Sequence, residues 1–413
     1  MQPSSTETRR GFFRDSSLWL AAALPTAGRV GHRDRIDLGL LGCDRRSVEL
    51  VASMLSAFPT SRLVAIADRF PDRVQAAVRG LKSRFPAQFA VDKATRYAGP
   101  GAGERLAEMP ADAVVAWSPP PCRAADLETL RHAGRDVYGA LPIIGASDSV
   151  AARLTDMLRP ELTRNVCIDP FGPLHGLLLK CADTPVANLW PIHDMEMCVE
   201  YSGCPVPPQS SRSDADRLWR AYEHFDAWGG RGTALRMQAI AVASALVADV
   251  PIEITPLPAE HHAACRDASA DGVPESDAAS CIESAWQVRF AHRQQFNLVL
   301  RKRSRPGRVR VHLVVSSSAG RHAFVLTPGE RSAPVAPRPV SSLSAVRRDH
   351  RQEGPPAAPP GPLTGSTTTS HLTLLRQPTW YSWLSGNLPA TALANRIAIS
   401  VLAVTPFSQE PSA

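Results

Sequence analysis

Lysine is nearly absent from this chain of 413 residues. Only four of the 46 basic residues are lysines, and the arginines are mostly dispersed among acidic residues. The net charge of +7 therefore indicates a bias towards arginine and not a surface stripe for nucleic acid, so we expect no nucleic-acid partner. A denser basic patch at residues 301–310 lies between two apolar runs. It is interpreted as a solvated hairpin tip, with contact to an anionic partner as the alternative.

Paired cysteines and long apolar runs are also missing. The eight cysteines include no Cys-x-x-Cys pair and no histidine at zinc spacing, which argues against a metal site. Beyond the N-terminus no stretch of about 18 apolar residues occurs, so we expect no membrane-spanning helix. With 44% hydrophobic and 21% charged residues, the composition is that of a globular protein, and 413 residues suffice for two or three domains.

The N-terminal segment has the pattern of a twin-arginine export signal. Arg9-Arg10 is followed by Phe12-Phe13 and then by a short apolar stretch, Leu18 to Leu24. Residues 1–30 are therefore predicted to direct export of the folded protein to the periplasm or cell envelope. The alternative is a disordered basic tail on a cytoplasmic protein.

Strands alternate with helices over residues 34–148. Short buried strands are expected at residues 35–42, 62–67, 111–117 and 136–138, with helices at 47–58, 71–85 and 124–133. This alternation is typical of an α/β domain with a doubly wound parallel sheet. We therefore predict a Rossmann-like domain at residues 34–148.

A second, α+β domain is predicted from residues 149–328 together with 371–413. Four runs alternate apolar and polar residues, at 284–293, 296–303, 308–317 and 322–327, which indicates an antiparallel meander with one buried face. Residues 388–404 are expected to form a closing helix. Residues 329–370 are rich in proline and serine and are predicted to form a mobile insertion.

A glycine turn and an acidic residue suggest a nucleotide site in the first domain. Gly39 and Gly42 end the first strand, and Asp68 lies 26 residues beyond Gly42, at the end of the next strand. This is the dinucleotide-binding arrangement. Asp68 could accept hydrogen bonds from the adenosine ribose, which favours NAD, or could cap the following helix. Arg69 could instead receive a 2′-phosphate, which would favour NADP.

Four segments carry a family resemblance. Gly-Leu-Leu-Gly-Cys at 39–43, Leu-Val-Ala-Ile-Ala-Asp-Arg-Phe-Pro-Asp-Arg at 63–73, Val-Val-Ala-Trp-Ser-Pro-Pro-Pro-Cys-Arg at 114–123 and His-Ala-Gly-Arg-Asp-Val-Tyr at 132–138 resemble the glucose–fructose oxidoreductase, inositol dehydrogenase and MocA family (Gfo/Idh/MocA). The resemblance covers about residues 34–148.

The resemblance implies both a fold and partners. It implies a Rossmann domain followed by an α+β domain whose open, mostly antiparallel sheet is commonly used for subunit contacts, and hence a homo-oligomer. The implied ligands are NAD or NADP and a sugar or cyclitol. Pro119 and Pro120 would lie against the nicotinamide half of the cofactor.

The turn departs from the family pattern Gly-x-Gly-x-x-Gly, because its three positions are Gly42, Asp44 and Ser47. A carboxylate about 4 Å from a phosphate costs about 4 kcal/mol at an effective dielectric constant of 20. Arg45 and Arg46 could offset this repulsion. Cofactor binding is therefore predicted, but weakened.

The positions where the family performs chemistry are also replaced. Ala140-Leu141-Pro142 stands where the family has Glu-Lys-Pro, and the family's histidine and aspartate in the second domain align with Gln238 and Ala241 through Gly229-Gly230. None of these side chains can act as the general acid or base at a substrate hydroxyl, which contributes about 10²- to 10⁴-fold. We therefore assign no catalytic residue.

Two functions remain open from the sequence. One is a catalytically impaired family member, a pseudoenzyme that serves as a ligand-binding or assembly module. The other is an active NAD(P)-dependent oxidoreductase on a sugar or cyclitol, in which another residue such as His193 or His175 has taken over the proton transfer.

Overall fold

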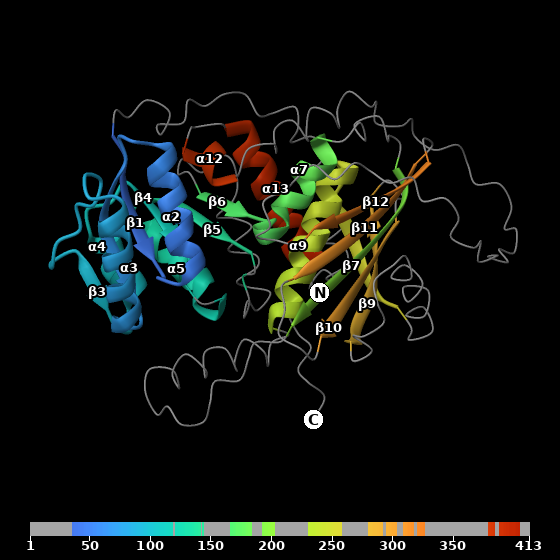
Figure 1. The fold of residues 1–413 in the computed structure, drawn as a ribbon, viewed down its shortest axis with the longest axis horizontal. Coiled ribbons are helices and arrows are strands. Elements are labelled where there is room, and N and C mark those ends of the chain that lie inside the picture. Colours follow the sequence, from blue (N-terminus) through green and yellow to red (C-terminus); the bar gives the residue numbers. More distant parts are fainter. Residues whose placement is uncertain are drawn as a thin grey trace, which may run out of the picture. The chain divides into compact units, whose positions relative to one another are not determined.

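The computed structural model describes the chain in twelve segments, which form two compact units (Figure 1). These segments are residues 35–118, 120–141, 143, 166–183, 192–202, 230–257, 280–291, 295–303, 309–317, 320–326, 379–384 and 388–404. The first unit comprises residues 1–172, 206–237 and 377–413, and the second comprises 173–205 and 238–376. The expected leader (1–30), the expected insertion (329–370) and Pro119 lie outside the described residues.

A six-stranded parallel sheet forms the centre of the first unit. Its strands are β1 (Asp37–Leu41), β2 (Arg62–Asp68), β3 (Arg96–Ala98), β4 (Ala113–Ala116), β5 (Asp136–Ala140) and β6 (Val166–Asp169). Their order is β3-β2-β1-β4-β5-β6. The strands β2 and β3 therefore lie on one side of β1, and β4, β5 and β6 lie on the other side. The predicted Rossmann-like parallel sheet is confirmed.

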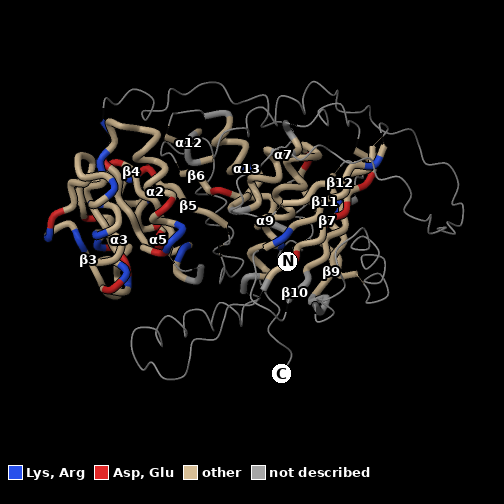
Figure 2. The backbone as a smooth tube through the Cα atoms, in the orientation of Figure 1, with Lys and Arg blue, Asp and Glu red and all other residues tan. Residues whose placement is uncertain are grey.

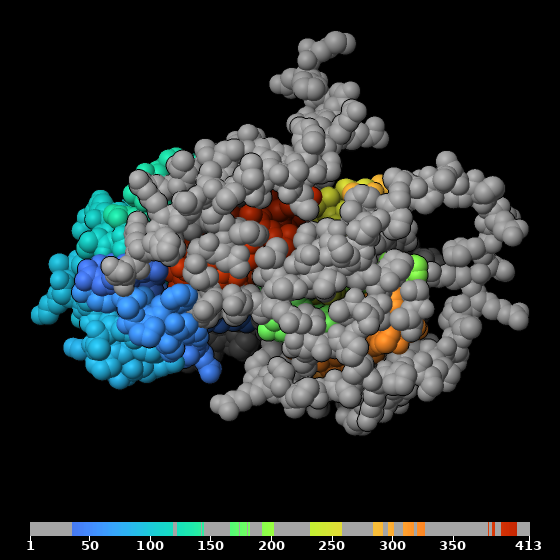
Figure 3. Space-filling model, turned by 90° about the horizontal axis from the view of Figure 1, so that it is seen from above, coloured from blue at the N-terminus to red at the C-terminus, as the bar shows by residue number. Residues whose placement is uncertain are grey.

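Amphipathic helices pack against this sheet. They are α2 (Arg45–Ala57), α3 (Pro71–Arg84), α4 (Ala102–Glu108) and α5 (Pro120–His132). Val51 and Leu55 of α2 pack with Leu38, Leu40 and Ile66 of the strands, all at most 1% exposed. The central strand β4 contains no charged residue (Figure 2). These elements, blue to cyan in the space-filling view, form one continuous body (Figure 3).

The C-terminal helices belong to the first unit. The sequence places residues 371–413 with the second domain, whereas α12 (Thr379–Leu384) and α13 (Leu388–Val404) pack on the edge strand β6. The amide of Asn395 donates from Nδ2 to the Val166 carbonyl oxygen at 2.6 Å and accepts through Oδ1 from the Ile168 backbone N–H at 2.8 Å. A side chain thus pairs two of the outward backbone groups that a seventh strand would have bonded.

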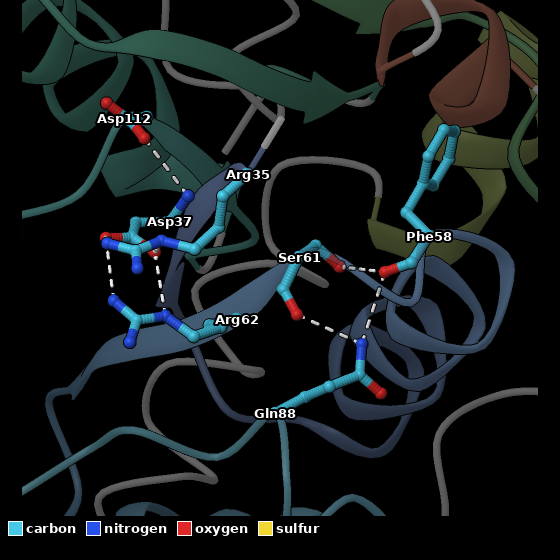
Figure 4. Close-up of polar contacts among 7 residues, drawn as sticks. All are labelled: Arg35, Asp37, Phe58, Ser61, Arg62, Gln88 and Asp112. Atoms are coloured by element: carbon cyan, nitrogen blue, oxygen red, sulfur yellow. Dashed lines mark hydrogen bonds and ion pairs between the residues drawn. The ribbon is translucent and has the colours of Figure 1, made fainter. Parts of the chain in front are cut away.

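Gln88 closes the connection between α2 and β2, at the amino end of the sheet. Its Nε2 donates to the carbonyl oxygens of Leu55, Phe58 and Ser61 at 3.0, 3.2 and 3.0 Å. Figure 4 shows Gln88 reaching Phe58 and Ser61, which also bond to each other. The two amide protons of one carboxamide are therefore shared among three carbonyl groups at the end of α2 and in the turn that follows it.

Asp37 joins the starts of three chain segments at the same edge. Its carboxylate accepts hydrogen bonds from Arg62 Nε and Nη2 at 3.2 Å each, and from Arg35 Nη2 at 3.4 Å. Its backbone N–H donates to Asp112 Oδ2 at 3.1 Å (Figure 4). These charges lie at the amino ends of the strands, away from the edge at which a nucleotide binds in such sheets.

The second unit contains a six-stranded mixed sheet that does not close into a barrel. Its strands are β7 (Ile192–Ser202), β8 (Pro251–Pro256), β9 (Ser280–Phe290), β10 (Gln295–Arg303), β11 (Arg310–Ser317) and β12 (Gly320–Leu326), in the order β12-β11-β7-β10-β9-β8. The open, mostly antiparallel sheet expected for the second domain is confirmed. Val311, Leu313 and Val315 of β11 form part of its buried face.

The predicted meander is wrong in one respect, because β7 lies between β10 and β11. It pairs parallel with β10 and antiparallel with β11. The basic patch at residues 301–310 is therefore not the tip of a two-stranded hairpin, and residues 304–308 of this patch lie outside the described residues. Local alternation reveals that a strand exists, but it carries no information on which strand is its neighbour.

Two helices accompany the second sheet. The helix α7 (His175–Asp183) packs on β12, where an added Cβ on Gly176 would lie 3.4 Å from Leu326. The helix α9 (Gly230–Val247) contributes its residues from Gln238 onward to this unit. Within the described segments, no helix has both the length and the apolar character needed to cross a bilayer.

Candidate nucleotide-binding site

The turn between β1 and α2 requires glycine at position 42. Gly42 has a φ of +86°, and an added Cβ would lie 2.5 Å from the carbonyl oxygen of Trp117 on the neighbouring strand segment. The Gly42 N–H donates to the Ala67 carbonyl oxygen at 2.8 Å. Gly39 lies inside β1, where an added Cβ would be 3.3 Å from Ala111 and Val114, so its role there is close packing.

Asp44 is the N-cap of α2. Its Oδ1 accepts from the Ser47 backbone N–H at 2.7 Å, and the Ser47 hydroxyl donates to the carbonyl oxygens of Gly42 and Asp44 at 2.6 and 2.9 Å. Ser47 is fully buried. The N-terminus of this helix would attract an anion, and the chain supplies its own carboxylate there.

Asp68, at the end of β2, hydrogen-bonds the turn between β1 and α2. The side chain is 3% exposed; Oδ2 accepts from the Cys43 backbone N–H at 2.5 Å and Oδ1 from the Phe70 N–H at 2.8 Å. Burial raises the pKa of Asp68, and these two hydrogen bonds oppose the increase. Capping of α3 by Asp68, one of the sequence interpretations, is wrong, because Phe70 is the N-cap and makes no side-chain cap bond.

Arg123 is a buried cation at the carboxyl edge of the sheet that the sequence analysis did not single out. It lies in the first turn of α5, which begins at Pro120, and it is 4% exposed. It hydrogen-bonds the carbonyl oxygens of Ser118 and Ala140, which follow β4 and end β5. Neither periodicity nor spacing distinguishes such an arginine from a surface arginine. The run of prolines before it was the only local signal.

The carboxyl end of β5 is apolar. Leu141 is 2% exposed and its backbone N–H donates to the Asp169 carbonyl oxygen at 2.9 Å, while Ile143 is fully buried. Pro142 lies outside the described residues. The residue at the family's lysine position therefore packs inside the first unit, and its side chain holds no exchangeable proton.

The two second-unit positions taken from the family lie within α9. Gln238 is 5% exposed and Ala241 is fully buried. Of the alternative histidines, His193 on β7 is exposed and His175 at the start of α7 is half-buried. In the part of the chain that the structure describes, no three His, Cys, Asp or Glu side chains come together as a metal site.

The fold occurs in several solved dehydrogenase and reductase structures. GenD2 from gentamicin A biosynthesis, in complex with NAD, is 18% identical, covering 92% of this chain and 96% of its own, with a TM-score of 0.51. Biliverdin reductase from Synechocystis sp. PCC 6803, with biliverdin and NADP⁺, is 12% identical, covering 89% and 99%, with a TM-score of 0.51.

A third solved structure extends the comparison. The myo-inositol dehydrogenase from Lactobacillus casei, with NAD(H) and myo-inositol, is 12% identical, covering 89% and 93%, with a TM-score of 0.50. No protein-family model and no curated protein sequence matches the chain. The chain has the two-domain fold of Gfo/Idh/MocA-type dehydrogenases, so the resemblance drawn from its sequence is confirmed at the level of the fold.

Proposed function

We propose that this chain binds a nicotinamide dinucleotide, NAD or NADP, weakly at the carboxyl edge of its first sheet and acts as a ligand-binding or assembly module without dehydrogenase turnover. The observation that carries the proposal is the combination of a close turn that requires glycine at position 42 with a buried Leu141 at the end of β5.

The geometry of the turn supports nucleotide binding. The order β3-β2-β1-β4-β5-β6 creates a topological switch between β1 and β4, where nucleotides bind in open α/β sheets. Gly42 lies at this switch, with its backbone against Trp117 at the end of β4. Three solved proteins with this fold are described as complexes with NAD, NADP⁺ or NAD(H).

The charge of the turn argues for weak binding. Asp44 already accepts the Ser47 N–H at the start of α2, so a diphosphate must approach a carboxylate there. Arg45 and Arg46 are exposed at the same helix start and reduce the repulsion.

The residues around β5 argue against dehydrogenase chemistry. The nicotinamide, when bound, would supply hydride acceptance or donation, and the protein must then move a proton to or from the substrate hydroxyl. Leu141 cannot move a proton, and its side chain is buried. An active oxidoreductase on a sugar or cyclitol is the second candidate; the complex of the myo-inositol dehydrogenase favours it, and it would need His175 or His193 as the proton carrier.

We expect no turnover when the protein is assayed with NAD and NADP against a panel of sugars and cyclitols, because the family's proton carrier is replaced by Leu141. The measurement is nicotinamide absorbance in the steady state. Robust turnover of any substrate would contradict the proposal. Its loss in His175→Ala or His193→Ala would then identify the proton carrier.

Asp44→Gly is expected to tighten NADH binding about tenfold, equivalent to about 1.4 kcal/mol, because it removes a carboxylate from the approach of the diphosphate. Asp44→Asn is the matched variant, since its amide oxygen can still accept the Ser47 N–H without a charge. Titration calorimetry on all three proteins measures the effect. Equal affinities would mean that the diphosphate does not lie at this turn.

Two further proposals come from the sequence. We propose that Arg9-Arg10 directs twin-arginine export, which is tested by retention of the precursor in the cytoplasm when both are replaced by lysine.

We also propose a homo-oligomer formed through the second sheet. On this sheet Arg321 of β12 forms an ion pair with Glu196 of β7 at 3.3 Å, and each of the two side chains is about a third exposed. A monomer in analytical ultracentrifugation would contradict the second proposal.

A further inference from the structure

The β4–β5 ladder stops before the carboxyl ends of its strands. Its last backbone pair is Val115 with Tyr138. Beyond this pair, the carbonyl oxygens of Ser118 and Ala140 both accept hydrogen bonds from Arg123. A side chain of α5 therefore continues the connection between the two chain segments after the backbone ladder has ended.

The guanidinium fixes both segments through its planar fork. Nε and Nη2 of Arg123 donate to the Ser118 oxygen at 3.1 and 2.8 Å, and Nη1 donates to the Ala140 oxygen at 2.8 Å. The Trp117 ring centroid lies 5.5 Å from the guanidinium carbon. Three donors in one plane determine both the separation and the orientation of the two carbonyl groups, which a lysine ammonium cannot do.

Arg123 also carries a positive charge that interacts with the carboxylate of Asp44. Burial lowers the pKa of Arg123 to about 10, and the carboxylates of Asp44 and Asp126 favour its charged form. The guanidinium is therefore protonated at neutral pH. Its attraction to Asp44 helps to accommodate a carboxylate at a turn position where the family has glycine.

We propose that Arg123 is a positioning residue of the nucleotide site, which holds the Ser118 and Ala140 carbonyl groups, and with them Leu141, at the separation that the nicotinamide half of a dinucleotide requires. Arg123 itself is buried and acts through the two carbonyl groups that it holds. The inference rests on the proposed dinucleotide binding. It adds that binding of the nicotinamide half, and not of the adenosine half, depends on Arg123.

The test compares a whole ligand with its adenosine half in the full-length protein. Titration calorimetry gives the affinities for NADH and for ADP in the unmodified chain, in Arg123→Lys and in Arg135→Lys. Arg135 is a matched control, because it also bonds two backbone carbonyls, those of Ala111 and Ala107 at 2.7 and 2.9 Å, at the amino side of β4.

We expect Arg123→Lys to weaken NADH binding about tenfold and to leave the ADP affinity unchanged, because only the nicotinamide half meets the displaced segments. Arg135→Lys should change neither affinity. Equal losses for NADH and ADP in Arg123→Lys, or no loss for either ligand, would overturn the inference. An unmodified chain that binds neither ligand would overturn the proposed function as well.

A second measurement needs no variant. Hydrogen exchange of the unmodified chain is followed with NADH, with ADP and without ligand. NADH is expected to slow exchange at residues 117–123 and 139–141, and ADP is not. If NADH binds but leaves these two segments unchanged, the nicotinamide half does not contact them and the assignment of Arg123 is wrong.

Discussion

Gly42→Ala is expected to lower the free energy of unfolding of the first unit by about 3 kcal/mol or more. The new Cβ would lie 2.5 Å from the Trp117 carbonyl oxygen, 2.6 Å from its carbon and 2.9 Å from the Ser118 nitrogen, all of which are backbone atoms. The φ of +86° adds a conformational cost of about 1 kcal/mol for an L-residue. Urea unfolding of the full-length chain measures the loss.

Gly80→Ala is the matched control for this experiment. Gly80 lies within α3, and an added Cβ would meet no atom within 4 Å. Alanine should therefore stabilise the helix by about 0.5 to 1 kcal/mol. If the two alanine variants were equally stable, the close approach of the Gly42 turn to the segment after β4 would be refuted.

Gln88→Glu should lower the free energy of unfolding of the first unit by about 3 kcal/mol at neutral pH. The replacement has nearly the same shape, but it removes both amide protons and places a carboxylate against the carbonyl oxygens of Leu55, Phe58 and Ser61. Lowering the pH should recover part of the loss, because a protonated carboxyl group regains one donor. Denaturant midpoints between pH 4 and 7 measure both effects.

Two comparison variants separate charge from packing at this site. Gln88→Met keeps most of the volume without a charge and should cost less than Gln88→Glu. Gln75→Glu makes the same chemical change on the exposed surface of α3 and should have little effect. A Gln88→Glu protein as stable as Gln75→Glu would show that the three carbonyl groups do not depend on this side chain.

Local sequence pattern predicted most elements of the first unit. The strand expected at residues 62–67 is β2 at Arg62–Asp68, and the helix expected at 388–404 is α13 at Leu388–Val404. Both are strong signals, because a continuous apolar run between polar turns and a long helical periodicity depend on burial alone. The glycine turn was found for the same reason, since its strand and helix are well marked.

The remaining features arise from contacts between distant residues. The insertion of β7 between β10 and β11 pairs residues about a hundred positions apart, such as Val199 with Leu300 and Val311. The roles of Arg123 and Asn395 depend on backbone groups of strands that each side chain meets only after folding. The N-cap at Asp44 is the exception, because Asp directly before a helical pattern is a common N-cap and could have indicated it.

The hydrogen bonds from Asn395 of α13 to the edge of β6 have a consequence for biosynthesis. The two residues that it bonds, Val166 and Ile168, leave the ribosome more than 220 residues before it does. At about 5 to 20 residues per second, translation leaves the outer edge of β6 without this partner for about ten seconds or longer. The outer edge of β6 therefore stays without this partner until α13 emerges, and a nonsense codon late in the gene would leave an edge strand of the first unit exposed.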